Sequence, residues 1–149
     1  MVRAIGLLRQ LPGRRLFQYR ADDGTVRGVT AREVNAFLRE IAGVNISLKD
    51  FRTLLASASV LETLARTKPA ASERQRRKQV LQAVSAAAED LANTPTICRK
   101  SYVHDTVVTA FEDGVLERFA QTLKTCRSPT RGAKVLAQII AAAGAPGLR

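Results

Sequence analysis

The sequence predicts a mainly α-helical protein with at most a small β-hairpin near its amino terminus. Apolar residues recur at helical spacing along most of the 149 residues. The segment Thr30-Ala-Arg-Glu33 is a capping box, which marks the start of a helix. A turn-forming segment, Asp22-Asp-Gly-Thr25, lies between the short runs 16–19 and 26–29, a pattern typical of a hairpin. At 46% hydrophobic residues, the chain is expected to form one globular domain.

The formal net charge of +11 predicts a polyanionic partner. DNA or RNA is the first expectation and an anionic membrane the second. Aromatic residues make up only 5% of the chain and tryptophan is missing, so base stacking is not expected to be the main binding mode.

The residue types argue against a metal or cofactor. Cys98 and Cys126 have no CxxC spacing and no histidine cluster, which argues against a zinc site and favours a reduced, cytosolic compartment. No phosphate-binding loop or dinucleotide fingerprint is present, so neither ATP nor NAD is expected. The apolar run in residues 1–10 is too short for a signal peptide or a membrane span.

Two helices are expected in the amino-terminal part, after a short helix end at residues 2–10 and a break at Leu11-Pro-Gly13. The first helix follows Thr30 and ends at Gly43. The second covers 47–66 and leaves Arg52 exposed beside its buried stripe. In the first helix the apolar residues Val34, Phe37, Leu38 and Ile41 recur at helical spacing. In the second helix the expected buried stripe is Phe51, Leu54, Leu55 and Ala58.

Further helices are expected from Ser72 to residue 91, over 107–111, over 115–125 and over 133–143. The 72–91 helix buries its apolar positions, which are Val80, Leu81, Val84, Ala87, Ala88 and Leu91. A basic run, 66–78, precedes and begins it. This run is interpreted either as a solvated linker and helix start or as a surface that tracks phosphates.

The stretch 91–104 carries the chemistry. Thr94 and Pro95 predict a helix start, which places Asn93 in the preceding loop and Tyr102 on the short helix that follows. Arg99 and Lys100 lie just before the tyrosine and can attract a phosphate. A positioned tyrosine oxygen can act as a nucleophile and form a covalent intermediate.

Three stretches resemble bacterial type IB DNA topoisomerases of the poxvirus-like branch. The nucleophile segment is matched by Asn93-Thr-Pro-Thr-Ile-Cys-Arg-Lys-Ser-Tyr-Val-His104. A Leu-Pro-Gly segment is matched by Leu11-Pro-Gly-Arg-Arg-Leu-Phe-Gln-Tyr19, followed by Asp23-Gly24. The third is matched by Val34-Asn-Ala-Phe-Leu-Arg-Glu-Ile-Ala-Gly43 and Leu48-Lys-Asp-Phe-Arg-Thr53. The resemblance implies the multi-helix catalytic fold that type IB topoisomerases share with tyrosine recombinases.

The resemblance also implies catalytic roles for Tyr102, Arg52 and Asn93. Tyr102 would attack a DNA phosphodiester and become joined to the 3′-phosphate, so that supercoiled DNA relaxes without ATP. Arg52 would stabilise the transition state, since a guanidinium can donate to two phosphate oxygens at once. Asn93 stands where poxvirus enzymes have histidine and would donate one hydrogen bond. Lys49, Arg99 and Lys100 are expected to contact DNA phosphates, whereas His104 and Tyr19 are assigned structural roles.

The family's general-acid lysine and first catalytic arginine lie upstream of its Leu-Pro-Gly segment, and no residue before Leu11 reproduces them. Leu54-Leu-Ala-Ser57 also departs from the family, whose members carry tryptophan and then Gly-Thr after the matching Arg-Thr pair. We therefore expect residues 1–149 to be the carboxy-terminal portion of a topoisomerase catalytic domain, either truncated or degenerate. Double-stranded DNA is the expected partner, the chain is expected to be a monomer, and its place is the cytoplasm, at the nucleoid.

Two other functions stay open. A tyrosine recombinase shares the fold and the arginine-to-tyrosine arrangement, but the Leu-Pro-Gly segment and the segment that begins at Val34 argue against it. An inactive DNA-binding remnant is supported by the missing lysine and by the net charge of +11.

Overall fold

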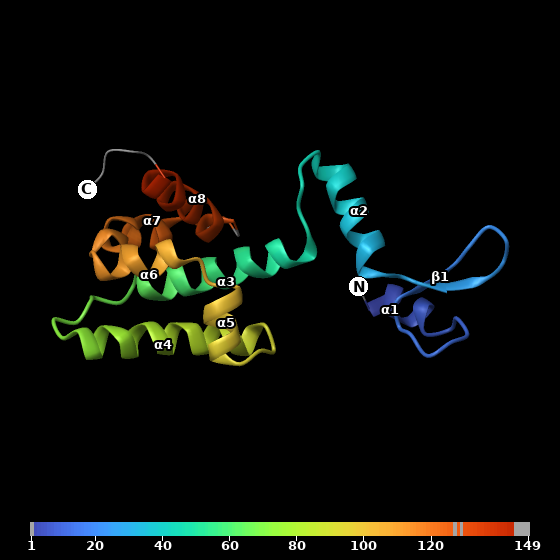
Figure 1. Cartoon of the computed structure of the whole chain (residues 1–149), viewed down its shortest axis with the longest axis horizontal. Coiled ribbons are helices and arrows are strands. Elements are labelled where there is room, and N and C mark those ends of the chain that lie inside the picture. The colour runs from blue at the N-terminus through green and yellow to red at the C-terminus, as the bar shows by residue number, and fades with distance from the viewer. Residues whose placement is uncertain (1, 127, 129, 145–149) are drawn as a thin grey trace. The chain divides into compact units, whose positions relative to one another are not determined.

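The protein is mostly helical with one small hairpin, as predicted (Figure 1). A computed structural model describes residues 2–126, 128 and 130–144. The chain divides into two compact units, residues 1–48 and residues 49–149. The single domain expected over residues 1–149 stays a prediction.

The unit of residues 1–48 holds the predicted hairpin between two helices. Strands β1 and β2 are antiparallel, with Gln18 opposite Gly28 and Arg20 opposite Val26. The elements are α1 (Val2–Leu8), β1 (Gln18–Arg20), β2 (Val26–Gly28) and α2 (Ala31–Ala42).

The local sequence sets both ends of α2. The Thr30 hydroxyl accepts from the Glu33 backbone N–H, and the Glu33 carboxylate accepts from the Thr30 backbone N–H. Gly43 ends the helix in the left-handed conformation, with φ of 66°. The predicted capping box and helix end are both confirmed.

The predicted packing role of Tyr19 is wrong. Its side chain is exposed, and its hydroxyl lies 3.5 Å from the Glu33 carboxylate. The buried residue of this strand is Gln18 instead, and its side-chain amide donates to the Leu11 carbonyl. Gly13 has φ of 131°, and a Cβ there would lie 2.7 Å from Gln18 Oε1, which explains the glycine.

The unit of residues 49–149 is a helical bundle around α3. Helix α4 packs against α5, and α6 packs against η1 and α8 (Figure 1). The elements are α3 (Leu48–Leu64), α4 (Glu73–Asp90), α5 (Pro95–Ser101), α6 (Asp105–Glu112), the 3₁₀ helix η1 (Val115–Phe119), α7 (Ala120–Thr125) and α8 (Arg131–Gly144).

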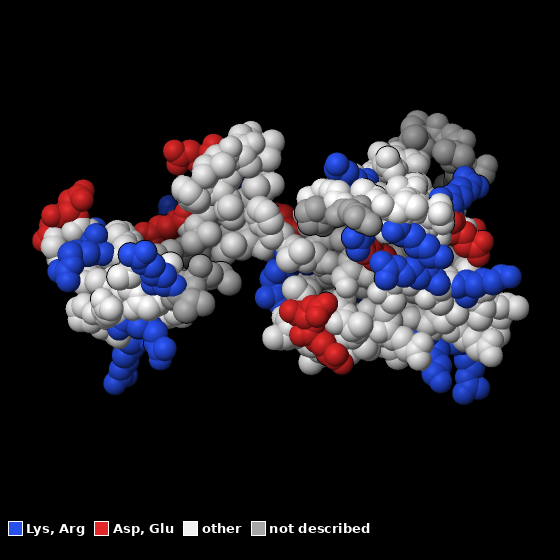
Figure 2. Space-filling model, turned by 180° about the vertical axis from the view of Figure 1, so that it is seen from behind, with Lys and Arg blue, Asp and Glu red and all other residues white. Residues whose placement is uncertain are grey.

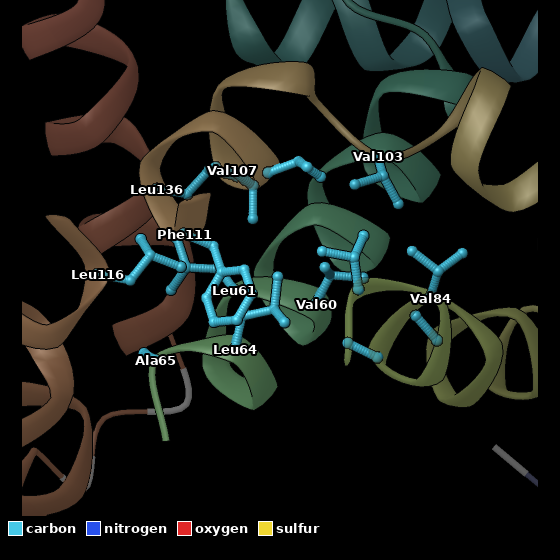
Figure 3. Close-up of a cluster of buried hydrophobic side chains, with 14 of the residues drawn as sticks. Val60, Leu61, Leu64, Ala65, Val84, Val103, Val107, Phe111, Leu116 and Leu136 are labelled. Carbon is cyan, nitrogen blue, oxygen red and sulfur yellow. The ribbon is translucent and has the colours of Figure 1, made fainter. Parts of the chain in front are cut away.

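The core of this unit joins residues from each of these helices (Figure 3). Val60, Leu61 and Leu64 of α3 lie at its centre, with Phe111 of α6 and Val84 of α4 around them. Each of these five side chains is almost completely removed from solvent. Burial on this scale makes the hydrophobic effect the main term that holds the bundle together.

The buried stripe predicted for the 47–66 helix is wrong, although the helix itself is confirmed as α3. Phe51, Leu54 and Leu55 are exposed and Ala58 is only half-buried. The buried residues are Ala56, Ser57, Val60, Leu61 and Leu64. Only the second half of α3 is surrounded by other helices of this unit, so its burial follows tertiary packing rather than local hydrophobicity.

Three smaller expectations need correction. Leu81 in α4 is exposed, while the other predicted apolar positions of this helix are buried or half-buried. The single helix expected over 115–125 is a 3₁₀ helix followed by α7. The last helix begins at Arg131, ahead of the expected 133–143, and Pro129 of the segment expected before it lies outside the described residues.

Candidate active site

Helix α5 delivers the tyrosine. The Thr94 hydroxyl accepts from the Ile97 backbone N–H, and Pro95 occupies the first helical position, as predicted. The expectation that Tyr102 lies on the helix needs correction, because α5 ends at Ser101 and Tyr102 is its C-cap. The Cys98 carbonyl accepts from the backbone N–H groups of Tyr102 and Val103. The tyrosine therefore stands where the chain turns between α5 and α6.

Arg52 lies over the Tyr102 ring. Its guanidinium carbon is 5.0 Å from the ring centroid, within the range of a cation–π contact. Both side chains are half-buried, which corrects the expectation that Arg52 is exposed. The structure therefore brings together two of the three predicted catalytic residues, which lie fifty positions apart in the sequence.

A second contact fixes Arg52. Its Nη2 donates a 3.0 Å hydrogen bond to the Leu91 carbonyl. Its Nε is buried and has no partner in the part of the chain that the structure describes. Arg52 is thus held from two sides and keeps donor groups that no described residue uses.

Asn93 lies in the loop between α4 and α5, as predicted. The residue before it, Ala92, has φ of 49°, the only positive φ outside glycine among the described residues. The left-handed conformation turns the chain back at the end of α4, and the Asn93 N–H donates to the Ala88 carbonyl at 2.8 Å. Arg52 touches this same turn at Leu91, two residues before Asn93.

Ser57 bonds to the backbone at Tyr102 and at His104. Its hydroxyl donates to the Tyr102 carbonyl and accepts from the His104 backbone N–H, both at 3.0 Å. Its side chain has 0% exposure. Ser57 was not among the predicted site residues. The available signal was its helical spacing with Val60, Leu61 and Leu64, which shows a polar residue on an apolar stripe.

His104 and Cys98 have structural environments. The His104 ring caps α6, with its Nδ1 accepting from the Thr106 backbone N–H at 3.3 Å. This agrees with the structural role assigned from the sequence. Cys98 is fully buried, and burial raises the pKa of its thiol, while the charge of Arg52 acts in the opposite direction. A protonated buried thiol is a poor nucleophile.

The predicted phosphate contacts differ in their availability. Lys49 and Lys100 are exposed. Arg99 is half-buried, and its Nη1 lies 2.7 Å from an Asp105 carboxylate oxygen. This ion pair holds the pKa of Asp105 below its ordinary value, through the hydrogen bond first and the charge of Arg99 second. A phosphate that takes up Arg99 has to compete with Asp105.

Some arginines of the basic run 66–78 are engaged in contacts within the protein. Arg76 donates to the Ala70 and Ala71 carbonyls, both at 2.9 Å, and so holds the loop before α4. Arg77 pairs with Glu73 one helical turn away. Figure 2 shows lysine and arginine side chains spread over the face of the larger unit in view, with smaller acidic groups among them.

Residues 5–128 match the protein family described as "Eukaryotic DNA topoisomerase I, catalytic core". This match covers most of the chain. The chain belongs to the topoisomerase I family. A curated relative, DNA topoisomerase 1B of Acanthamoeba polyphaga mimivirus, is 31% identical over 106 residues, which cover 66% of this chain and 32% of the relative. The chain thus spans about a third of the length of that topoisomerase.

The topoisomerase ancestry identifies the chain as descended from an isomerase that acts on DNA. The matched range, 5–128, contains the three segments that carry the sequence resemblance and all three candidate catalytic residues, Arg52, Asn93 and Tyr102. Among residues 2–126, 128 and 130–144, no helix is long and apolar enough to cross a membrane. The same residues hold no group of three or more potential metal ligands.

Proposed function

We propose that this chain carries the DNA-cleaving tyrosine of a type IB topoisomerase. The Tyr102 hydroxyl attacks a backbone phosphodiester, forms a bond from its oxygen to phosphorus and gives up its proton. The bond from phosphorus to the 5′-oxygen breaks, and that oxygen takes up a proton to become a 5′-hydroxyl. The cut strand swivels, and the 5′-hydroxyl then reverses the attack. Because the phosphotyrosine bond conserves the energy, the cycle as proposed uses neither ATP nor a metal.

The observation that carries this proposal is the contact between Arg52 and Tyr102. A phosphate placed for attack by the tyrosine oxygen lies within reach of the guanidinium. Negative charge develops on the non-bridging phosphate oxygens in the transition state, and a guanidinium can donate to two of them. Arg52 can turn to such a ligand because Nη2 is its only donor bonded to a described residue.

Asn93 and the nearby cations complete the proposed site. The Asn93 amide donates to a non-bridging oxygen, and it has no proton to transfer at neutral pH. Lys49, Lys100 and Arg99 bind phosphates that flank the cleaved bond, with Arg99 released from Asp105 when DNA is present. Asparagine at position 93 also supports placement in the bacterial, poxvirus-like branch. We further propose that the protein acts on double-stranded DNA as a monomer at the nucleoid.

The proton for the leaving oxygen comes from outside these 149 residues. The chain spans about a third of the length of the related mimivirus enzyme, so most of such an enzyme lies outside the matched part. A general acid contributes about 10²–10⁴-fold to a reaction rate. The chain by itself is therefore expected to relax supercoiled plasmid poorly, and a polypeptide that carries the general acid, added in trans, should increase relaxation.

A substrate with a sulfur leaving group tests the cleavage step by itself. A 5′-bridging phosphorothiolate in duplex DNA needs no proton on the leaving group, because a thiolate departs readily. The 149-residue chain should slowly form a covalent adduct with this DNA, detected as a shifted band on a denaturing gel. Tyr102→Phe should abolish the adduct. Tyr19→Phe is the matched control, since it changes the one other tyrosine of the chain, and should leave the adduct unchanged.

An adduct that survives Tyr102→Phe would mean that the nucleophile is another residue. Rapid relaxation by the 149-residue chain would mean that it contains its own general acid. DNA binding without any adduct would favour the inactive DNA-binding remnant.

A further inference from the structure

We propose that Ser57 is a positioning residue for Tyr102, which it holds in place for attack on the phosphodiester. This inference rests on the proposed nucleophilic role of Tyr102. Ser57 itself has 0% exposure and cannot touch DNA. Its influence has to pass through the backbone on either side of the tyrosine carbonyl.

The chemistry of the hydroxyl fixes the direction of both hydrogen bonds. A backbone N–H can only donate, so the Ser57 oxygen accepts from His104. The single hydroxyl proton is then free for the Tyr102 carbonyl, which can only accept. Both bonds measure 3.0 Å. One side chain thus satisfies two backbone groups that are two residues apart.

These two backbone groups lie at helix ends, where they have no partner within the helix. The Tyr102 carbonyl lies just past the end of α5, and the His104 N–H lies at the N-cap of α6. Helix ends leave such carbonyl and N–H groups without partners inside the helix. No other described residue donates to the Tyr102 carbonyl or accepts from the His104 N–H. Ser57 therefore fixes the joint between α5 and α6, where the tyrosine is attached.

The same helix holds the tyrosine at a second point. Arg52 and Ser57 are five residues apart on α3. Arg52 contacts the face of the Tyr102 ring, and Ser57 bonds to its carbonyl. Helix α3 therefore contacts both the ring and the backbone of Tyr102. Val103 is buried in the core directly after the tyrosine, which limits movement on that side.

A hydroxyl at this buried position costs desolvation unless it is hydrogen-bonded. The neighbours of Ser57 on the buried face of α3 are apolar: Ala56, Val60, Leu61 and Leu64. An alanine or valine would suit this face equally well by hydrophobicity. Only a hydroxyl can form the two hydrogen bonds to residues 102 and 104.

The test compares Ser57→Thr with Ser57→Val in the full 149-residue chain. Threonine and valine have nearly the same shape, so both crowd the core equally, and only threonine keeps the hydroxyl. We expect adduct formation on the phosphorothiolate DNA at saturating protein to be about 10- to 100-fold slower for valine than for threonine. DNA affinity should be the same in both. Hydrogen exchange of the His104 amide, followed by NMR, should be faster in the valine variant.

A second control separates positioning from general destabilisation. Val60→Ala removes buried volume from the same helix, one turn further on, and leaves both Ser57 bonds in place. It should lower the unfolding temperature while the adduct rate stays within about 3-fold of wild type well below that temperature, since both hydrogen bonds of Ser57 are kept. A similar rate loss in Val60→Ala would overturn the positioning role.

The outcomes distinguish this inference from the proposed function. Equal adduct rates for the threonine and valine variants, with an active wild type, would overturn the role of Ser57 alone. A wild-type chain that binds the phosphorothiolate DNA and forms no adduct would overturn the proposed function and, with it, the positioning role. Faster His104 amide exchange without any rate difference would show a purely structural serine.

Discussion

The guanidinium carbon of Arg52 lies 5.0 Å from the centroid of the Tyr102 ring. Arg52 also donates to the Leu91 carbonyl, so its resting position is set by the tyrosine and by the turn before Asn93. Each of these contacts contributes about 1–3 kcal/mol in a half-buried site. Contacts this weak can give way to a phosphate.

Arg52→Ala should slow adduct formation on phosphorothiolate DNA by about 10²–10³-fold, the usual cost of one transition-state donor. The rate for Arg52→Lys should fall between those of Arg52→Ala and wild type, because lysine keeps the positive charge but lacks the paired N–H donors of a guanidinium. The rates are measured on denaturing gels. Arg66→Ala, which removes an exposed arginine beyond the end of α3, is the control for charge alone. Full activity of Arg52→Lys would rule out bidentate contact.

Phe111→Ala should destabilise the bundle by about 3–5 kcal/mol, because Phe111 is 1% exposed in the core. Phe51→Ala should cost less than about 1 kcal/mol, because Phe51 is 44% exposed. The two variants delete the same atoms, so any difference between them reports burial. Denaturant unfolding measures both. Equal losses would mean that the amino-terminal half of α3 is buried in solution.

The ion pair with Arg99 lowers the pKa of Asp105 below 3.8 in the folded protein. Such a carboxylate stabilises the fold above its unfolded pKa, and this stabilisation is lost as the pH falls through the folded value. Arg99→Gln should therefore raise the pKa of Asp105 towards 3.8, measured by NMR titration of its carboxyl group. Asp23, whose pKa is lowered by hydrogen bonds from Thr25, is the internal control and should titrate unchanged. No change at Asp105 would mean that the ion pair does not form in solution.

Duplex DNA of any sequence should bind, with an affinity that falls steeply as salt rises, because each neutralised phosphate releases counterion. Lys100→Gln should reduce the slope of log affinity against log salt by about 0.9 if Lys100 contacts one phosphate. Lys134→Gln, on α8, is the control and should leave the slope unchanged. Titrations at several salt concentrations measure the slopes. A flat salt response in wild type would contradict phosphate-dominated binding.

Local sequence chemistry predicted the helix starts well. Thr30 and Thr94 cap the helices assigned to them, because a capping hydroxyl acts on N–H groups only two or three residues away. The hairpin followed from its turn residues in the same way. The loop position of Asn93 followed from one cap and one proline, whereas the end of α5 just before Tyr102 did not.

Long-range packing was not predictable from the same signals. The stripe Phe51, Leu54 and Leu55 has the spacing of a buried face, yet burial depends on which half of α3 other helices cover. Ser57 was missed because its partners lie 45 and 47 residues away. The Leu91 carbonyl that accepts from Arg52 leaves no trace in the sequence, since every residue has a carbonyl.

The five-residue spacing between Arg52 and Ser57 on α3 makes this helix intolerant of insertions and deletions. An α-helix rotates by about 100° and rises about 1.5 Å per residue. One extra residue between the two would turn either the guanidinium or the hydroxyl to a different side of the helix. Substitutions between Arg52 and Ser57 keep this spacing, whereas an insertion or deletion changes it. Homologues that keep both side chains should therefore differ between them in residue type and never in the number of residues.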